Sequence, residues 1–101
     1  MKNKLKLILW GKKLQLPEDY DNLEFDGYEL KDDKRYKLYL YKNNEVIKLI
    51  WYYENKNKSF EYNYKNGKFD EKQYVWNSDG KIMYKDNYKN GKLFNKLKIT
   101  D

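Results

Sequence analysis

Tyr64-Lys65-Asn66-Gly67-Lys68-Phe69 recurs 24 residues later as Tyr88-Lys89-Asn90-Gly91-Lys92-Leu93. A weaker copy, Tyr41-Lys42-Asn43-Asn44-Glu45-Val46, lies 23 residues before the first. In each copy, two residues that tolerate positive φ separate short alternating apolar runs. This pattern is the strongest short-range signal of a β-hairpin with a two-residue turn. The repeat therefore predicts three successive hairpins.

Pairing residues directly across these turns predicts which side chains share a face of the sheet, because a slip of one residue moves every side chain to the opposite face. The predicted pairs are Tyr64 with Phe69, Tyr88 with Leu93, Leu40 with Ile47, Leu38 with Leu49, Tyr36 with Trp51, Trp51 with Phe60, Val75 with Ile82 or Tyr84, and Tyr84 with Leu97. From residue 36 onward, the pattern predicts a six-strand antiparallel meander with all these residues on one apolar face.

The first 35 residues are predicted to form irregular strands and a loop. Leu5, Leu7 and Leu9 alternate along the chain, which is typical of a strand, and Pro17 indicates a loop. The run 23–30 is predicted to be another strand. These segments are expected to continue the sheet or to cover it, because an apolar sheet face must curl, be covered or dimerise.

The sequence thus predicts one all-β domain over residues 1–101, with irregular strands at 1–35 and hairpin repeats of about 24 residues at 36–101. The expected architecture is a single twisted antiparallel meander of about seven to nine strands that can curl into a half-barrel.

Composition narrows the function classes. The chain has 101 residues, with 22 Lys+Arg against 16 Asp+Glu and a net charge of +6 at pH 7. It contains no cysteine and no histidine, so thiolate nucleophiles, imidazole bases and the usual zinc ligands are missing. We therefore predict that the protein is not an enzyme and holds no cofactor or metal. The apolar run Leu7 to Trp10 is too short for a signal-peptide core or a membrane span, so we expect a cytoplasmic protein.

The Tyr-Lys-Asn-Gly-Lys units, each followed by an aromatic run and an Asn/Asp-Gly turn, resemble the variant MORN repeats (membrane occupation and recognition nexus) of small bacterial proteins. Many of those proteins are labelled as antitoxins or immunity proteins. The resemblance covers residues 51–95 well and 36–50 loosely. The family's glycines are replaced at Asn44, Lys56, Glu71 and Asn95. The resemblance implies an elongated or curled sheet of hairpins whose surface binds a protein.

The second face of the predicted sheet interleaves aromatic rings with lysines. The predicted partner contacts on it are Tyr39, Tyr41, Tyr52, Tyr74, Trp76, Lys37, Lys48, Lys72 and Lys85. Three interpretations compete: the rings are core between two covered faces, they anchor a protein interface, or they stack nucleic-acid bases while lysines contact phosphates.

We favour a protein partner, a toxin or a defence enzyme, that the chain neutralises by steric occlusion. The alternative is sequence-independent binding of single-stranded nucleic acid or RNA by the same face. Membrane binding is not favoured, because the sequence shows no amphipathic helix or lipid anchor. A homodimer is a further way to cover an apolar sheet face.

Overall fold

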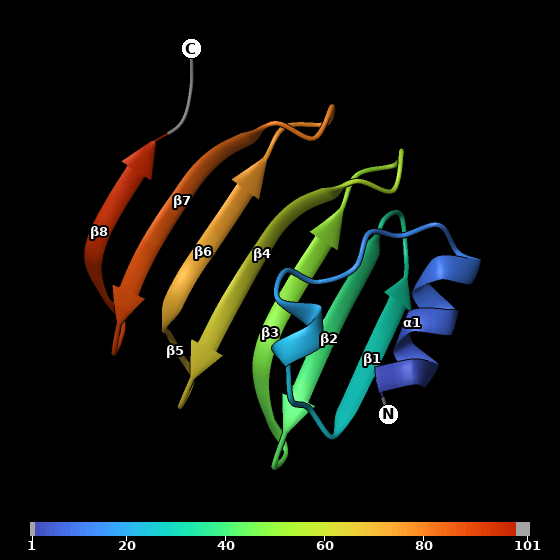
Figure 1. Cartoon of the computed structure of the whole chain (residues 1–101), viewed down its shortest axis with the longest axis horizontal. Helices are drawn as coiled ribbons and strands as arrows, with labels where there is room; N and C mark the ends of the chain where they lie inside the picture. Colours follow the sequence, from blue (N-terminus) through green and yellow to red (C-terminus); the bar gives the residue numbers. More distant parts are fainter. Residues whose placement is uncertain (1, 99–101) are drawn as a thin grey trace.

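The computed structural model describes the backbone of residues 2–98 and the side chains of residues 4–95. These residues form one open antiparallel sheet of eight strands, with a helix and a loop packed on one side (Figure 1). The predicted all-β meander is confirmed, and β1 and β8 lie at its two edges. Residue 1 and residues 99–101 of the predicted domain lie outside the described residues.

The elements follow one another across the sheet almost in chain order. They are α1 (Lys2–Gly11), η1 (Tyr20–Asn22), β1 (Gly27–Asp32), β2 (Tyr36–Lys42), β3 (Glu45–Tyr52), β4 (Lys58–Lys65), β5 (Lys68–Phe69), β6 (Glu71–Trp76), β7 (Ile82–Lys89) and β8 (Lys92–Lys98). The short β5 pairs with the end of β4, and β6 pairs with the middle of β4. The strand predicted over 23–30 is β1, which begins at Gly27.

The three predicted two-residue turns are confirmed. Asn43-Asn44, Asn66-Gly67 and Asn90-Gly91 have φ angles between 53° and 82° at both positions. The longer connections, 53–57 and 77–81, also repeat each other: the fourth residue of each, Lys56 and Gly80, has a positive φ angle, 75° and 94° respectively. The 24-residue sequence repeat is therefore a repeat of backbone conformation.

The predicted register is correct close to the Asn-Gly turns. Tyr64 pairs with Phe69 and Tyr88 pairs with Leu93. The predicted neighbours Trp51 with Phe60 and Val75 with Tyr84 are also observed. Turn geometry thus fixes the register locally, as hairpin turns do.

Farther from the turn, β-bulges shift the register by one residue. Leu40 pairs with Lys48 instead of the predicted Ile47, which is left as an extra residue in β3. The β7–β8 hairpin has its extra residue at Phe94, the equivalent position in its repeat. Because a bulge adds one residue to one strand, the later side chains of that strand exchange faces relative to the partner strand.

The prediction of one continuous apolar face is therefore wrong. The pairs observed in place of the predicted ones are Leu38 with Ile50, Lys37 with Trp51, Lys85 with Leu97, and Tyr84 with Lys98. Leu38 is fully buried beside Ile50, whereas Leu49 lies on the opposite face with Tyr39.

The predicted strand over residues 4–9 is also wrong, because this segment lies in α1. Leu5 and Leu9, one helical turn apart, are fully buried, whereas Leu7 is 69% exposed. A Schellman motif ends the helix: Lys13 has a φ of 62°, and the Leu14 N–H donates to the Leu9 carbonyl at 2.8 Å.

The sheet has two unlike faces. The covered face lies beneath α1 and the loop that follows it, and the core there consists of Leu5, Leu9, Leu14, Leu38, Leu40, Ile50 and Tyr52. No described element packs on the other face, which we call the open face (Figure 1). The open face carries Lys37, Tyr39, Tyr41, Val46, Leu49, Trp51, Phe60, Tyr62, Tyr64, Phe69, Val75, Tyr84, Asp86 and Tyr88.

Candidate functional site

A row of aromatic rings crosses the open face. The ring centroids of Trp51 and Phe60 are 5.3 Å apart, and those of Phe60 and Tyr62 are 4.2 Å apart, both pairs stacked. The row continues from Tyr62 to Phe69 at 5.0 Å and from Phe69 to Tyr88 at 5.1 Å. These rings come from β3, β4, β5 and β7, so cross-strand contacts hold each ring in place. All five side chains remain partly exposed.

Two lysines lie over rings of the open face. The Lys37 ammonium is 4.4 Å from the centroid of Trp51, and the Lys31 ammonium is 5.1 Å from that of Tyr39. Such cation–π contacts hold the lysine stem against the aromatic surface while the charge stays near water.

Two hollows lie on the described part of the open face. The larger, about 430 Å³, is lined by Tyr39, Glu45, Val46, Leu49, Tyr64 and Gly67. The smaller, about 250 Å³, is lined by Tyr62, Phe69, Gln73, Val75, Tyr84, Asp86 and Tyr88. Burial raises the pKa of Tyr62 and of Tyr64, and neighbouring tyrosines add to both shifts.

The nine predicted partner contacts do not share one face. Lys37, Tyr39 and Tyr41 lie on the open face. The other six, on the covered face, are Lys48, Tyr52, Lys72, Tyr74, Trp76 and Lys85. The bulge at Ile47 separates the two groups. Because Ile47 is an extra residue, every later side chain of β3 points to the opposite face from the one that the turn predicts.

Several of these six residues are core. Tyr52 has no exposed surface, and its hydroxyl donates to the Gln15 carbonyl at 2.7 Å. Tyr74 and Trp76 are 7% and 8% exposed and stack with centroids 5.4 Å apart. Burial raises the pKa of Tyr74 to about 12, and the nearby carboxylates of the loop and β4 contribute. The hydrogen bond from Tyr52 to Gln15 joins the N-terminal segment to the sheet.

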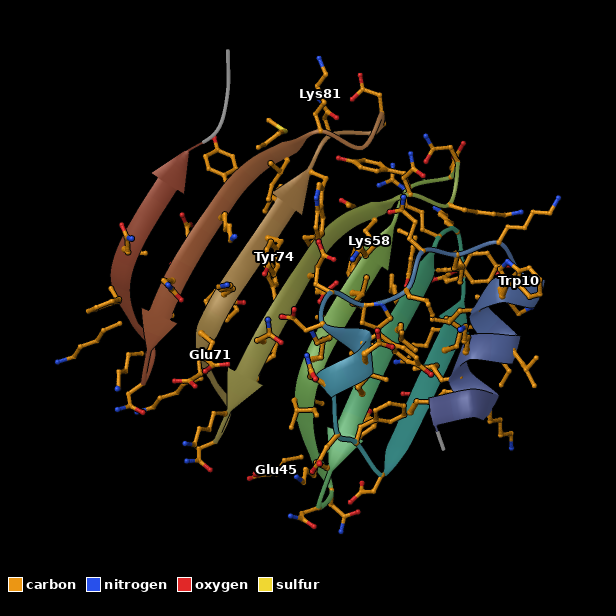
Figure 2. All side chains as sticks on the ribbon, in the orientation of Figure 1. Trp10, Glu45, Lys58, Glu71, Tyr74 and Lys81 are labelled. Atoms are coloured by element: carbon orange, nitrogen blue, oxygen red, sulfur yellow. The ribbon has the colours of Figure 1, made fainter. Side chains whose placement is uncertain are left out.

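The sequence reasoning missed a buried ionic cluster, which we call the Glu61 clamp (Glu18, Lys48, Lys58 and Glu61). Glu61 is fully buried, and its two carboxylate oxygens accept the Glu18 backbone N–H at 3.0 and 2.9 Å. Lys58 donates to Glu61 at 2.9 Å, and Lys48 also donates to it. Figure 2 labels Lys58, the first residue of β4. Nothing in the sequence marked Glu61 as buried, because the predicted register put its neighbour Phe60 on the apolar face and Glu61 on the opposite face.

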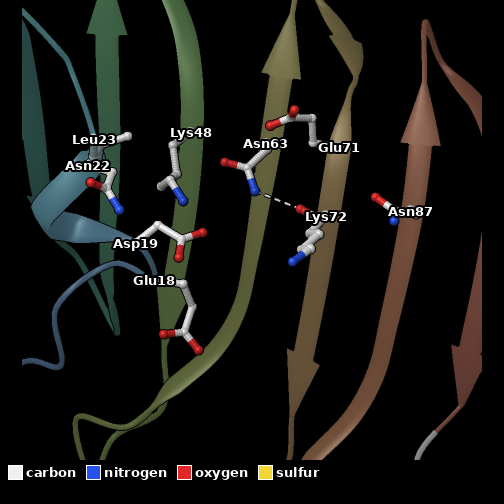
Figure 3. Close-up of a pocket in the computed structure, with 9 residues that line it drawn as sticks. All are labelled: Glu18, Asp19, Asn22, Leu23, Lys48, Asn63, Glu71, Lys72 and Asn87. Atoms are coloured by element: carbon white, nitrogen blue, oxygen red, sulfur yellow. Dashed lines mark hydrogen bonds between the residues drawn. The ribbon is translucent and has the colours of Figure 1, made fainter.

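A polar groove of about 600 Å³ lies between the N-terminal loop and β4, β6 and β7 (Figure 3). Its lining residues are Glu18, Asp19, Asn22, Leu23, Lys48, Asn63, Glu71, Lys72 and Asn87. The Asn63 side chain donates to the Lys72 carbonyl at 2.6 Å, and Lys48 is paired with Glu61. The side chains of Asn63 and Lys48 in this groove are therefore engaged by other residues of the chain.

The described residues hold no group of three or more Asp, Glu, His or Cys side chains placed to bind a metal ion. None of their helices is both long and apolar enough to cross a membrane. The chain matches no protein-family model, no curated protein and no solved structure in the comparisons made.

Proposed function

We propose that this chain is a non-catalytic protein-binding module that inhibits or neutralises its partner by steric occlusion through the open face. The observation that carries this proposal is the row of five rings on a sheet face that no described element covers. Tyrosine, tryptophan and phenylalanine are enriched in protein interfaces and dominate their hot spots. An exposed aromatic patch of this kind marks an interaction site.

The open face is suited to tight binding because its rings are held before the partner arrives. Each ring in the row contacts a neighbour, so little rotamer entropy is lost on association. The molecule measures 34 × 34 × 25 Å, so a sheet face can supply the roughly 800 Å² that one partner contributes to a standard interface. The resemblance to MORN repeats of antitoxins and immunity proteins supports a toxin or a defence enzyme as the partner.

The distribution of lysines supports a protein partner over single-stranded nucleic acid. Of the four predicted contact lysines, Lys48, Lys72 and Lys85 lie on the covered face and only Lys37 lies on the open face. A surface that binds single strands needs stacking rings and phosphate-neutralising cations together. The bulge at Ile47 leaves three of the four predicted contact lysines on the covered face, away from the ring row, while Lys37 and Lys31 lie over rings of the open face.

The test replaces two open-face rings by residues that suit a strand: Tyr62→Thr with Tyr64→Thr. Threonine has a high β propensity, so the sheet should form while the ring row is interrupted. The matched control is Leu7→Gln with Trp10→Gln, which removes exposed apolar surface from α1 on the other side of the molecule (Figure 2). Both variants are compared with the unaltered chain in binding to the partner protein that the unaltered chain captures. We expect the open-face variant to lose at least about tenfold in affinity and the control to bind normally.

Circular dichroism verifies that both variants fold, and salt separates the two partner classes. Protein binding should change little between about 50 and about 200 mM salt, whereas binding of a labelled oligo-dT or oligo-U strand should fall steeply. A folded open-face variant that keeps full affinity for the partner would contradict the proposal. Tight oligonucleotide binding that the same variant abolishes would do so as well.

A further inference from the structure

The smaller hollow of the open face is distinguished by a carboxylate among aromatic rings. Asp86 lies in β7 between Tyr84 and Tyr88 on the same face, and it pairs with Gln73 of β6. The hollow of about 250 Å³ is lined by Tyr62, Phe69, Gln73, Val75, Tyr84, Asp86 and Tyr88. Because a charge that is partly removed from water is costly unless it is paired, an anion on an otherwise aromatic surface is stabilised by a nearby positive charge.

One oxygen of Asp86 lacks a partner. Its Oδ1 is buried and forms no hydrogen bond with any described residue. Buried polar atoms are nearly always satisfied, so the Asp86 carboxylate lies beside the hollow without the hydrogen bond that this oxygen would normally accept. Asp86 also contributes to the raised pKa of Tyr62, after burial and Tyr88, which places its negative charge next to the rings.

The ring geometry indicates the shape of the missing group. Tyr62 and Phe69 are inclined by 53°, and Phe69 and Tyr88 by 73°, so the rings form walls at an angle. A planar guanidinium stacks face to face on an aromatic ring, whereas the compact ammonium of lysine has no such planar requirement. Aromatic faces attract cations, and cages of rings bind methylated ammonium groups. The volume is below the roughly 300 Å³ of the smallest drug-sized sites, so it accommodates one head group.

We infer that this hollow receives a lysine side chain of the protein partner, with the ammonium at Asp86 and the methylene stem against the rings. A dimethylated lysine binds more tightly, because it is less hydrated and keeps one N–H for the Asp86 carboxylate. This inference rests on the proposed function, since it names the partner residue that anchors in the open face.

The test titrates the chain with Nα-acetyl-lysine amide, its dimethyl derivative and neutral Nα-acetyl-norleucine amide while aromatic NMR signals are recorded. We expect saturable shifts of the Tyr62, Phe69 and Tyr88 ring signals with both cations and none with norleucine amide. Asp86→Asn, which keeps the side-chain shape, should weaken the binding of both cations about fivefold or more. Glu45→Gln, at the larger hollow, should leave these shifts unchanged.

Three results would overturn the inference: equal binding of norleucine amide, unaltered cation binding by Asp86→Asn, or no saturable shift at all. Lys96 is the backbone partner of Asp86 in β8. Cation binding that appears only in Lys96→Ser would show that this chain fills the hollow itself, which also overturns the inference. Capture of the partner separates the two proposals: if Tyr62→Thr with Tyr64→Thr abolishes capture but the cations do not bind, only this inference fails.

Discussion

At position 61, one buried carboxylate joins the sheet to the N-terminal loop. Glu61 accepts hydrogen bonds from the Glu18 backbone and from two lysines that are themselves buried, Lys48 at 3% and Lys58 at 6% exposure. Burying charge is costly unless each ion is paired and hydrogen-bonded. The loop that covers the sheet therefore depends on this side chain.

Glu61→Gln should strongly destabilise the protein, because it leaves the buried Lys48 ammonium without a counter-charge and leaves Lys58 with only the partly exposed Glu18 carboxylate. We expect a loss of about 3–5 kcal/mol in the free energy of unfolding, measured by urea titration. The control is Glu18→Gln, since Glu18 contacts Glu61 through its backbone and its own side chain, 44% exposed, lies 3.6 Å from Lys58. The control should cost less than about 1 kcal/mol. Equal effects of the two substitutions would contradict the clamp.

Tyr52 makes the free energy of unfolding fall at alkaline pH. Burial, and then the charge of Glu61, raises the pKa of Tyr52 above its ordinary value of 10.0. The folded state holds this proton more tightly than the unfolded chain, so its contribution is complete below pH 10 and is lost as the pH rises beyond it. Above about pH 10, Tyr52 should remove about 1.4 kcal/mol of stability per pH unit.

Tyr52→Phe should abolish that part of the pH dependence and cost about 1 kcal/mol at neutral pH for the lost hydrogen bond to Gln15. Urea titrations of both proteins between about pH 9 and pH 11 give the two slopes. The other tyrosines and the lysines contribute equally to both proteins. Coincident slopes would show that the Tyr52 hydroxyl is not buried.

At the scale of single elements, turns were predictable and bulges were not. Asn-Gly is a local chemical signal for positive φ, so the three hairpins could be predicted from sequence. The bulged residues Ile47 and Phe94 are ordinary strand formers, and nothing in their identity marks them as unpaired. A second pair of bulges, at Ser59 and Met83, lies 24 residues apart. The bulges thus belong to the repeat, although single residues do not reveal them.

The helix α1 was missed because its apolar residues fit two periods. Leu5, Leu7 and Leu9 satisfy the strand period of two, and Leu5 and Leu9 satisfy the helical period. Leucine and lysine are both strong helix formers, so local propensity favours the helix. Its end was equally hidden, because the left-handed position of the Schellman motif holds Lys13 instead of glycine.

The loop at 53–57 offers a test of the repeat geometry. Lys56, with a φ of 75°, occupies the position that Gly80 holds in the next repeat. Lys56→Gly should raise stability by about 0.5–1 kcal/mol, because the left-handed region costs a side chain about 1–2 kcal/mol and glycine returns part of this in entropy. Thermal unfolding measures the change. Glu54→Gly, in the same loop without positive φ, should lower stability; if both substitutions lower it equally, the equivalence of the two loops fails.

At the scale of the whole molecule, the composition predicted a sheet with many aromatic side chains, but the predicted alternation along the strands assigned many of them to the wrong face. The aromatic content indicated more rings than the core of one sheet needs. In the structure, the additional rings lie on the open face. Six of the nine predicted contacts belong to the covered face instead, because pairing without bulges exchanges the faces from β3 onward. A register predicted from turns is thus reliable for one or two pairs, and tertiary packing decides the rest.

The sorting of side chains between the two faces can be measured directly, because the chain has no cysteine. Leu49 lines the larger hollow of the open face, and its neighbour Ile50 has no exposed surface. We predict that Leu49→Cys reacts readily with a maleimide in the native protein, and that Ile50→Cys reacts only when the protein unfolds. Bound partner should protect Leu49→Cys. Fast labelling of Ile50→Cys together with protection of Leu49→Cys in the free protein would show that the two side chains lie on the opposite faces from those described here. That result would contradict the central claim.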